Sequence, residues 1–267
     1  MKKTFKIALA CFWYRKSVGE NLKTLLDHVK KAAAQGCDMV CFGEAVFSGM
    51  PSEDYARDLK LAISLDGPQA RAISRSAADN NIWIAFGAME QRRGNLYDTA
   101  LLYNNKGRLV HRYARISRGW LTPRNKQKAY KMGKAVRAVK TPFGRFAFEI
   151  CGDIYDEGIR ARLNALSPDY LFCLMWRSFA SGKYDQTYWE KVERPEYLRQ
   201  LRGVGSAAFF VNTLSREKDE HTFGGPMAIS KRGRVLKEGR LGKPALLVCD
   251  VPVLAKESKQ SPSRNCR

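Results

Sequence analysis

Short apolar runs alternate with amphipathic segments along this chain of 267 residues. Residues 6–11 and 38–42 are apolar runs of the kind that form buried strands. Between them, residues 18–35 carry apolar side chains at helical spacing, and Gly36 follows as a helix stop. Because such helices bury one face against a sheet, the alternation predicts an α/β chain with two sheets and outer helices.

The same patterns predict the remaining elements. Helices are expected at residues 69–81, 157–166 and 187–203, and strands at 82–86, 97–103, 108–113, 145–151, 170–175, 207–212, 225–229, 234–236 and 245–251. Asn and Gly within residues 104–107, and the turn at 231–233, suit hairpins. An irregular basic loop is expected between the strands at 108–113 and 145–151. We expect residues 1–255 to form one domain and residues 256–267 to form a basic, flexible tail.

The composition excludes several classes of protein. The 45% of apolar residues can build a large core, which excludes wholesale disorder. No apolar run reaches the roughly 20 residues of a membrane span, and no cleavage signature follows the basic start, so we expect a cytoplasmic protein without a membrane partner. Seven cysteines without CxxC pairs argue against disulfides and structural zinc. Without P-loop, GxGxxG, HExxH or EF-hand patterns, we expect no metal and no cofactor.

The positive charge is concentrated in one part of the chain. The sequence has 47 Lys and Arg against 26 Asp and Glu, a net charge of +21. Residues 99–148, which we call the acid-free segment, contain 13 Lys or Arg and no Asp or Glu. This segment is either a solvated basic surface or a surface that attracts anions. Aromatic residues among its cations favour a nucleic-acid-binding module as the rival class, but no nucleic-acid fold signature accompanies them, so nucleic acid is not the expected partner.

Two reactive side chains follow apolar strand-like runs. Glu44 follows residues 39–43, where partial desolvation raises a carboxyl pKa and suits it to general-base work. Cys151 follows residues 146–150 and precedes a helix, whose amides favour a thiolate and hold an oxyanion. The three histidines offer Cys151 no evident partner, so a carboxylate is its expected base. Taken alone, a cysteine that follows a strand is more often a packing residue, and a glutamate at a strand end is commonly a helix cap.

Several segments together resemble the nitrilase superfamily of carbon–nitrogen hydrolases. The resemblance rests on segments that occur in the family's order: residues 40–49 (VCFGEAVFSG), residues 95–100 (NLYDTA) with Gly107 and residues 113–115 (YAR), residues 148–153 (FEICGD) with Glu157, Arg160 and Trp176, residues 202–212, and residues 223–228 (FGGPMA). It covers about residues 5–252 in colinear order, and this colinearity makes it specific.

The resemblance implies a four-layer αββα sandwich that assembles as a homodimer or larger homo-oligomer. It implies that Glu44 is the general base and that Cys151 is the nucleophile that forms an acyl-enzyme. A backbone N–H, here that of Gly152, and the family's lysine stabilise the oxyanion. Trp176 and Tyr113 are then expected to contact the substrate, although an ordinary core aromatic and an ordinary strand residue are equally consistent with the sequence.

The chain departs from the family pattern at two places. Arg115 occupies the lysine position, where a planar guanidinium keeps the charge but cannot give up a proton at neutral pH. The additional glutamate that many members carry is excluded by the acid-free segment, which offers Lys126, Gln127 and Lys128 instead. The first change keeps the positive charge near Cys151, and the second makes the net charge there more positive.

Two hypotheses of function follow. In the first, the protein hydrolyses an amide or N-carbamoyl group of a small molecule through a cysteine acyl-enzyme, and the basic entrance recruits an anionic substrate. In the second, Arg115 marks a weakened or inactive member that binds a ligand. A nitrile is the least expected substrate, because Gly152 and Asp153 replace the Trp-Glu pair that follows the cysteine of true nitrilases.

Overall fold

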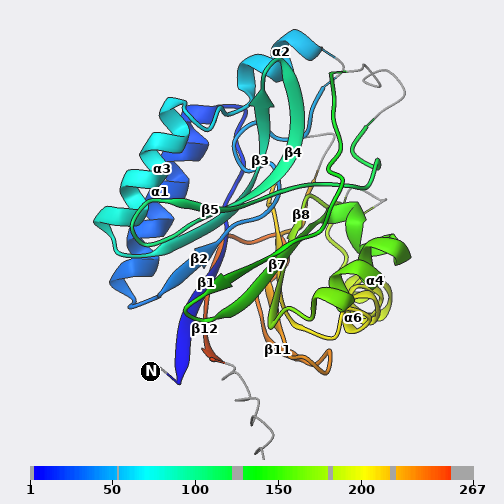
Figure 1. Cartoon of the computed structure of the whole chain (residues 1–267). Helices are drawn as coiled ribbons and strands as arrows, with labels where there is room; N and C mark the ends of the chain where they lie inside the picture. Colours follow the sequence, from blue (N-terminus) through cyan, green and yellow to red (C-terminus); the bar gives the residue numbers. More distant parts are fainter. Residues whose placement is uncertain (1–2, 53, 122–128, 180–182, 217–220, 254–267) are drawn as a thin grey trace, which may run out of the picture.

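The computed structural model describes residues 3–52, 54–121, 129–179, 183–216 and 221–253. It contains two six-stranded sheets that face each other, with helices on both outer faces (Figure 1). The chain therefore has the expected four-layer αββα sandwich. No helix within these ranges is long and apolar enough to cross a membrane. The predicted tail, residues 256–267, lies outside the described residues.

The first sheet has the strand order β12-β1-β2-β3-β4-β5. Its strands are β1 (Thr4–Cys11), β2 (Met39–Cys41), β3 (Trp83–Arg92), β4 (Asn95–Tyr103), β5 (Leu109–Ala114) and β12 (Ala245–Pro252). The helices α1 (Val18–Ala34) and α3 (Pro68–Asp79) cover its outer face (Figure 1). A further helix, α2 (Tyr55–Leu61), lies at one end of this layer.

The second sheet has the strand order β11-β10-β9-β8-β7-β6. Its strands are β6 (Ala138–Thr141), β7 (Gly144–Ile150), β8 (Tyr170–Met175), β9 (Ala207–Asn212), β10 (Met227–Ile229) and β11 (Val235–Glu238). Its helices are the 3₁₀ turn η1 (Cys151–Tyr155), α4 (Glu157–Leu166), α5 (Gln186–Tyr188), the π turn η2 (Trp189–Glu193) and α6 (Arg194–Arg202). In Figure 1, α4 and α6 lie on the outer face of this sheet.

Aromatic side chains fill the space between the two sheets. Phe5 of β1 stacks on Phe143 and meets the ring edges of Tyr170 and Phe209, with ring centroids 4.8, 5.4 and 6.4 Å away. Offset and edge-to-face contacts of this kind add to the hydrophobic gain of burying large rings. The packing fixes the sheets against each other and so fixes the residues at their edges.

The predicted and observed elements differ in several places. The helix α2 and the short edge strand β6 were not expected. The strand predicted at 82–86 continues to Arg92, since the buried Glu90 within it is neutralised by Arg92 and Arg112. The strand predicted at 145–151 ends at Ile150, because Cys151 begins η1.

The helix predicted at 187–203 is three consecutive pieces: α5, the π turn η2 and α6. Pro195 lies in the first turn of α6. Proline has no N–H to donate, and its ring clashes with the carbonyl four residues earlier, so the preceding turn widens to a π turn. The prediction of a helical segment was therefore correct, and the prediction of one regular α-helix was wrong.

Candidate active site

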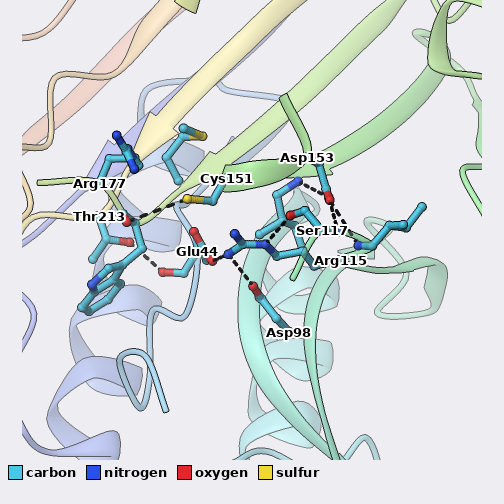
Figure 2. A network of polar contacts seen from close by, with 12 residues as sticks. Glu44, Asp98, Arg115, Ser117, Cys151, Asp153, Arg177 and Thr213 are labelled. Carbon is cyan, nitrogen blue, oxygen red and sulfur yellow. Dashed lines mark hydrogen bonds and ion pairs between the residues drawn. The ribbon is translucent and has the colours of Figure 1, made fainter. Parts of the chain in front are cut away.

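Three strand ends bring Glu44, Arg115 and Cys151 together. Glu44 follows β2, Arg115 follows β5 and Cys151 follows β7. Figure 2 shows the carboxylate of Glu44 between the sulfur of Cys151 and the guanidinium of Arg115. These residues lie far apart in the sequence, and their meeting depends on the two sheets facing each other.

Glu44 is completely buried and its backbone is held on both sides. Its N–H donates to the carbonyl of Met175 at 3.3 Å, and its carbonyl accepts from the hydroxyl of Thr213 at 2.7 Å. On the other side it lies against Gly87, where a Cβ atom would come within 2.6 Å of the Glu44 Cα. The backbone of Glu44 is therefore held in one position by the middle of β3 and by the ends of β8 and β9.

Arg115 lies between two buried carboxylates. Its Nη1 donates to Glu44 Oε1 at 2.8 Å and to Asp98 Oδ2 at 3.4 Å, while its Nε donates to the hydroxyl of Ser117 at 2.9 Å. Only 3% of the Arg115 surface is exposed. Burial of a guanidinium is tolerated when its charge is paired and hydrogen-bonded, and here Nη1 and Nε both have acceptors.

Asp98 is the site residue that the sequence reasoning missed. It stands one residue before the acid-free segment, and the β4–β5 pairing places residue 99 opposite residue 114. The N–H of Arg115 donates to the carbonyl of Asp98 at 2.8 Å, which continues that pairing by one residue. The hairpin register could have identified Asp98 as the neighbour of Arg115.

Burial controls the ionisation of this cluster. It raises the pKa of Glu44 to about 8; the Cys151 thiol adds to this rise and Arg115 opposes it. Burial, followed by the charge of Glu44, raises the pKa of Asp98 well above its usual range. Burial lowers the pKa of Arg115, but Glu44 and its other anionic neighbours raise it more, so the guanidinium stays charged. The two carboxyl groups therefore keep protons to a higher pH than exposed carboxyl groups do.

Cys151 occupies a constrained turn between β7 and α4. Its φ of +44° lies in the left-handed region, which is costly for a residue with a side chain and recurs at functional sites. Its Sγ lies 3.9 Å from the carbonyl oxygen of Trp176, and 7% of the residue is exposed. Within the described ranges no histidine contacts this sulfur.

The next residue, Gly152, lies directly against Arg115. A Cβ atom at position 152 would come within 2.6 Å of Arg115 Nη2 and 2.9 Å of the Ser117 hydroxyl. Glycine is thus the residue that fits beside this guanidinium. Arg115 and Gly152 are a matched pair in this chain.

Asp153 holds the cysteine turn in place. Its carboxylate accepts hydrogen bonds from the N–H groups of Ile150, Ile116 and Ser117, at 3.1, 3.2 and 2.8 Å. It also accepts from the hydroxyl of the buried Tyr113 at 2.7 Å. The Tyr113 hydroxyl is therefore directed at the support of the cysteine turn, and contact between Tyr113 and a substrate stays a prediction.

Trp176 and Arg177 border the site opposite Arg115. The Trp176 ring is mostly buried and meets Tyr14 edge to face, with centroids 5.1 Å apart. The Arg177 side chain donates from Nε to the Tyr197 hydroxyl at 3.3 Å, and its guanidinium lies over the Tyr155 ring, 5.9 Å from the ring centre. Its terminal nitrogens have no hydrogen-bond acceptor among the described residues. In Figure 2, Arg177 and Arg115 lie on opposite sides of Cys151. The sequence reasoning did not single out Arg177, although it adjoins Trp176.

A family model described as carbon–nitrogen hydrolase matches residues 7–259. The chain belongs to the carbon–nitrogen hydrolase family. A hydrolase of Schizosaccharomyces pombe is 26% identical over 159 residues, which cover 57% of this chain and 49% of the relative. Nitrilase 2 of Arabidopsis thaliana is 23% identical over 142 residues, which cover 46% of this chain and 40% of the relative. The chain thus matches about half, or less, of the length of these relatives.

Solved structures share the fold of this carbon–nitrogen hydrolase family member. The amidase from Nesterenkonia sp. AN1, with acrylamide added to its active-site cysteine, has a TM-score of 0.76 and 18% identity, covering 93% of each chain. The glutamine-dependent NAD+ synthetase from Acinetobacter baumannii has a TM-score of 0.75 and 18% identity, covering 93% of this chain and 45% of the synthetase. At these identities the likeness establishes the fold.

Proposed function

We propose that the protein hydrolyses the C–N bond of a small amide or N-carbamoyl compound through an acyl-enzyme on Cys151. The observation that carries the proposal is the buried Glu44 carboxylate between the thiol and a fixed guanidinium (Figure 2). Glu44 accepts the thiol proton, and the sulfur attacks the carbonyl carbon to form a C–S bond. The C–N bond breaks as Glu44 returns the proton to the leaving amine or ammonia. Glu44 then takes a proton from water, whose oxygen displaces the sulfur and releases the acid.

The negative charge on the substrate oxygen needs donors during both attacks. The Gly152 N–H follows the nucleophile directly, and Arg115 Nη2 lies beside the same residue. Donors held in place before the reaction stabilise an oxyanion without reorganising. Arg115 supplies charge and hydrogen bonds and stays protonated, so Glu44 carries all the proton transfers.

The substrate we favour carries a carboxylate away from its amide. Arg177 lies on the side of Cys151 opposite Arg115; its guanidinium lies over the Tyr155 ring, and its terminal nitrogens have no hydrogen-bond acceptor among the described residues. A guanidinium in that position matches the planar geometry of a carboxylate. We therefore expect an amide of a dicarboxylic acid, or an N-carbamoyl amino acid, to be turned over faster than a neutral amide of equal size.

A second candidate, a weakened member that binds a ligand, is supported by the close packing of Arg115 on Gly152. A guanidinium in this space reduces the room for the substrate oxygen. Such a protein would bind amides without releasing ammonia.

Ammonia release distinguishes these functions. The assay uses matched neutral and anionic amides, with Cys151→Ala as the test variant and Cys249→Ala, a buried cysteine of β12, as the control. We expect release from the wild type and from Cys249→Ala, and none from Cys151→Ala. Amide binding without ammonia from the wild type would favour the weakened member, and the absence of both would reject the hydrolase.

A further inference from the structure

A cationic cleft lies outside the active site, along the edge strand β5. It has a volume of about 610 Å³ and is bounded by β5, by the start of β4 and by residues 132–137. Arg92, Arg112, Lys134 and Arg137 line it, and no acidic side chain is among the described residues that do. All but Arg92 belong to the acid-free segment, so the cleft shows where part of that segment's charge gathers.

The charges in this cleft are only partly neutralised. Arg92 and Arg112 both pair with the buried Glu90, through Arg92 Nη2 at 3.1 Å and Arg112 Nε at 2.9 Å. One carboxylate therefore serves two guanidinium groups. Lys134 and Arg137 are exposed, and their side chains have no partner among the described residues. Excess charge of one sign in a concave surface focuses the field and attracts counter-ions.

The walls of the cleft are held by the fold. The N–H of Gly133 donates to the carbonyl of Arg115 at 2.7 Å, and a Cβ atom at position 133 would come within 2.0 Å of the Ala114 carbonyl oxygen. The N–H of Lys131 donates to the carbonyl of Leu96 at 2.8 Å. Residues 129–133 are therefore fastened to the first sheet, and the cations that follow them are placed opposite Arg112.

The aromatic rings in the cleft are already covered. The Arg92 guanidinium lies 4.1 Å from the centre of the Tyr97 ring, and the His111 ring stacks on Phe148 with centroids 5.2 Å apart. Tyr113 is buried, and its hydroxyl donates to Asp153. Nucleic-acid grooves combine cations with free aromatic faces for the bases, so this cleft has the charge without the stacking surface.

We propose that this cleft binds a small anion that carries phosphate groups, at a site separate from Cys151. Planar guanidinium groups and a flexible ammonium suit phosphate oxygens. Inorganic pyrophosphate is the probe, because it carries phosphate charge and no base.

Calorimetric titration of pyrophosphate at fixed salt tests this proposal. The test variant is Lys134→Gln with Arg137→Gln. The control is Lys106→Gln with Arg108→Gln, which removes the same charge from the exposed β4–β5 turn of the same acid-free segment. We expect one binding site per chain, at least about tenfold weaker binding in the test variant, and less than about a twofold change in the control.

Four results would overturn the proposal. The first is no saturable binding, and the second is equal weakening of binding in both double variants. The third is loss of binding in Arg177→Gln without loss of binding in the test variant. The fourth is tighter binding of a single-stranded oligonucleotide through Lys134 and Arg137. The second would show a diffuse charge effect, the third an anion in the active site, and the fourth a nucleic-acid surface. None of them bears on hydrolysis at Cys151.

Discussion

Arg115 constrains each of its neighbours at the active site. It needs Glu44 and Asp98 for its charge, Ser117 for its Nε, and a residue without a side chain at position 152. A guanidinium that only blocked the site would not require matched hydrogen-bond acceptors around it. We therefore interpret Arg115 as adapted to this site.

Arg115→Lys tests that interpretation. A lysine ammonium cannot reach Glu44, Asp98 and Ser117 together, so we expect kcat/KM for the best amide to fall roughly 10- to 100-fold. Arg108→Lys, on the exposed turn, is the matched control and should leave kcat/KM unchanged. A large gain in kcat/KM in Arg115→Lys would instead show that the arginine slows the reaction.

Gly152→Ala tests the match between the two residues. The added methyl group meets Arg115 Nη2, so we expect a loss of about 1–3 kcal/mol in the free energy of unfolding and a loss of activity. Adding Arg115→Lys should recover part of the lost stability and part of the lost activity, which gives a coupling energy in a double-mutant cycle. Gly19→Ala, in open space on α1, is the control and should not destabilise. Strictly additive losses would contradict the match.

The rate should depend on the ionisation of Glu44. A general base works in its ionised form, and burial raises the pKa of Glu44 to about 8. We expect kcat/KM to rise as the pH increases from 6 and to level off above about 8. A profile that is flat from pH 6 to 9 in initial-rate measurements would contradict Glu44 as the base.

Among the elements, those with an uninterrupted apolar pattern were predicted best. The observed bounds of α4, β8 and β9 coincide with those predicted, because their runs end at clear turn residues. The pattern fails at β3: the predicted strand ended at Phe86, whereas β3 continues through the buried Glu90, whose partner Arg112 is on β5. The sequence shows that residue 90 is a glutamate, but which arginine neutralises its charge depends on the fold.

β7 carries a further buried carboxyl group, Glu149. Both of its oxygens are buried without a hydrogen-bond partner among the described residues, and burial raises its pKa to about 8. Its folded pKa lies above that of a free glutamate, so the folded state binds the extra proton. This contribution to stability is complete below the pKa of a free glutamate and is lost as the pH rises to about 8.

Glu149→Gln removes this titration. Between pH 5.5 and 8, we expect the wild-type free energy of unfolding to fall by about 3 kcal/mol more than that of the variant. Denaturant unfolding at both pH values measures the difference. Glu157→Gln, exposed in the first turn of α4, should keep the wild-type slope. Equal slopes for Glu149→Gln and the wild type would show that Glu149 ionises as an ordinary carboxyl group.

At the scale of the whole molecule, the motifs and their order predicted the four-layer sandwich and the family. They placed Glu44, Arg115 and Cys151 at strand ends, which the facing sheets bring together. Asp98 and Arg177 could not be assigned in the same way, because their roles depend on which strand ends meet. The domain bounds, the homodimer and the cytoplasmic location stay predictions, and Lys126, Gln127 and Lys128 lie outside the described residues.

The central claim is that Cys151 forms an acyl-enzyme with an amide substrate. Intact-mass measurement after rapid mixing with the best amide, followed by peptide mapping, tests it most directly. We expect a mass increase equal to the acyl group, located on Cys151, absent from Cys151→Ala, and accompanied by ammonia in excess over enzyme. Ammonia release without any adduct on Cys151, or an adduct on another residue, would rule out an acyl-enzyme on Cys151.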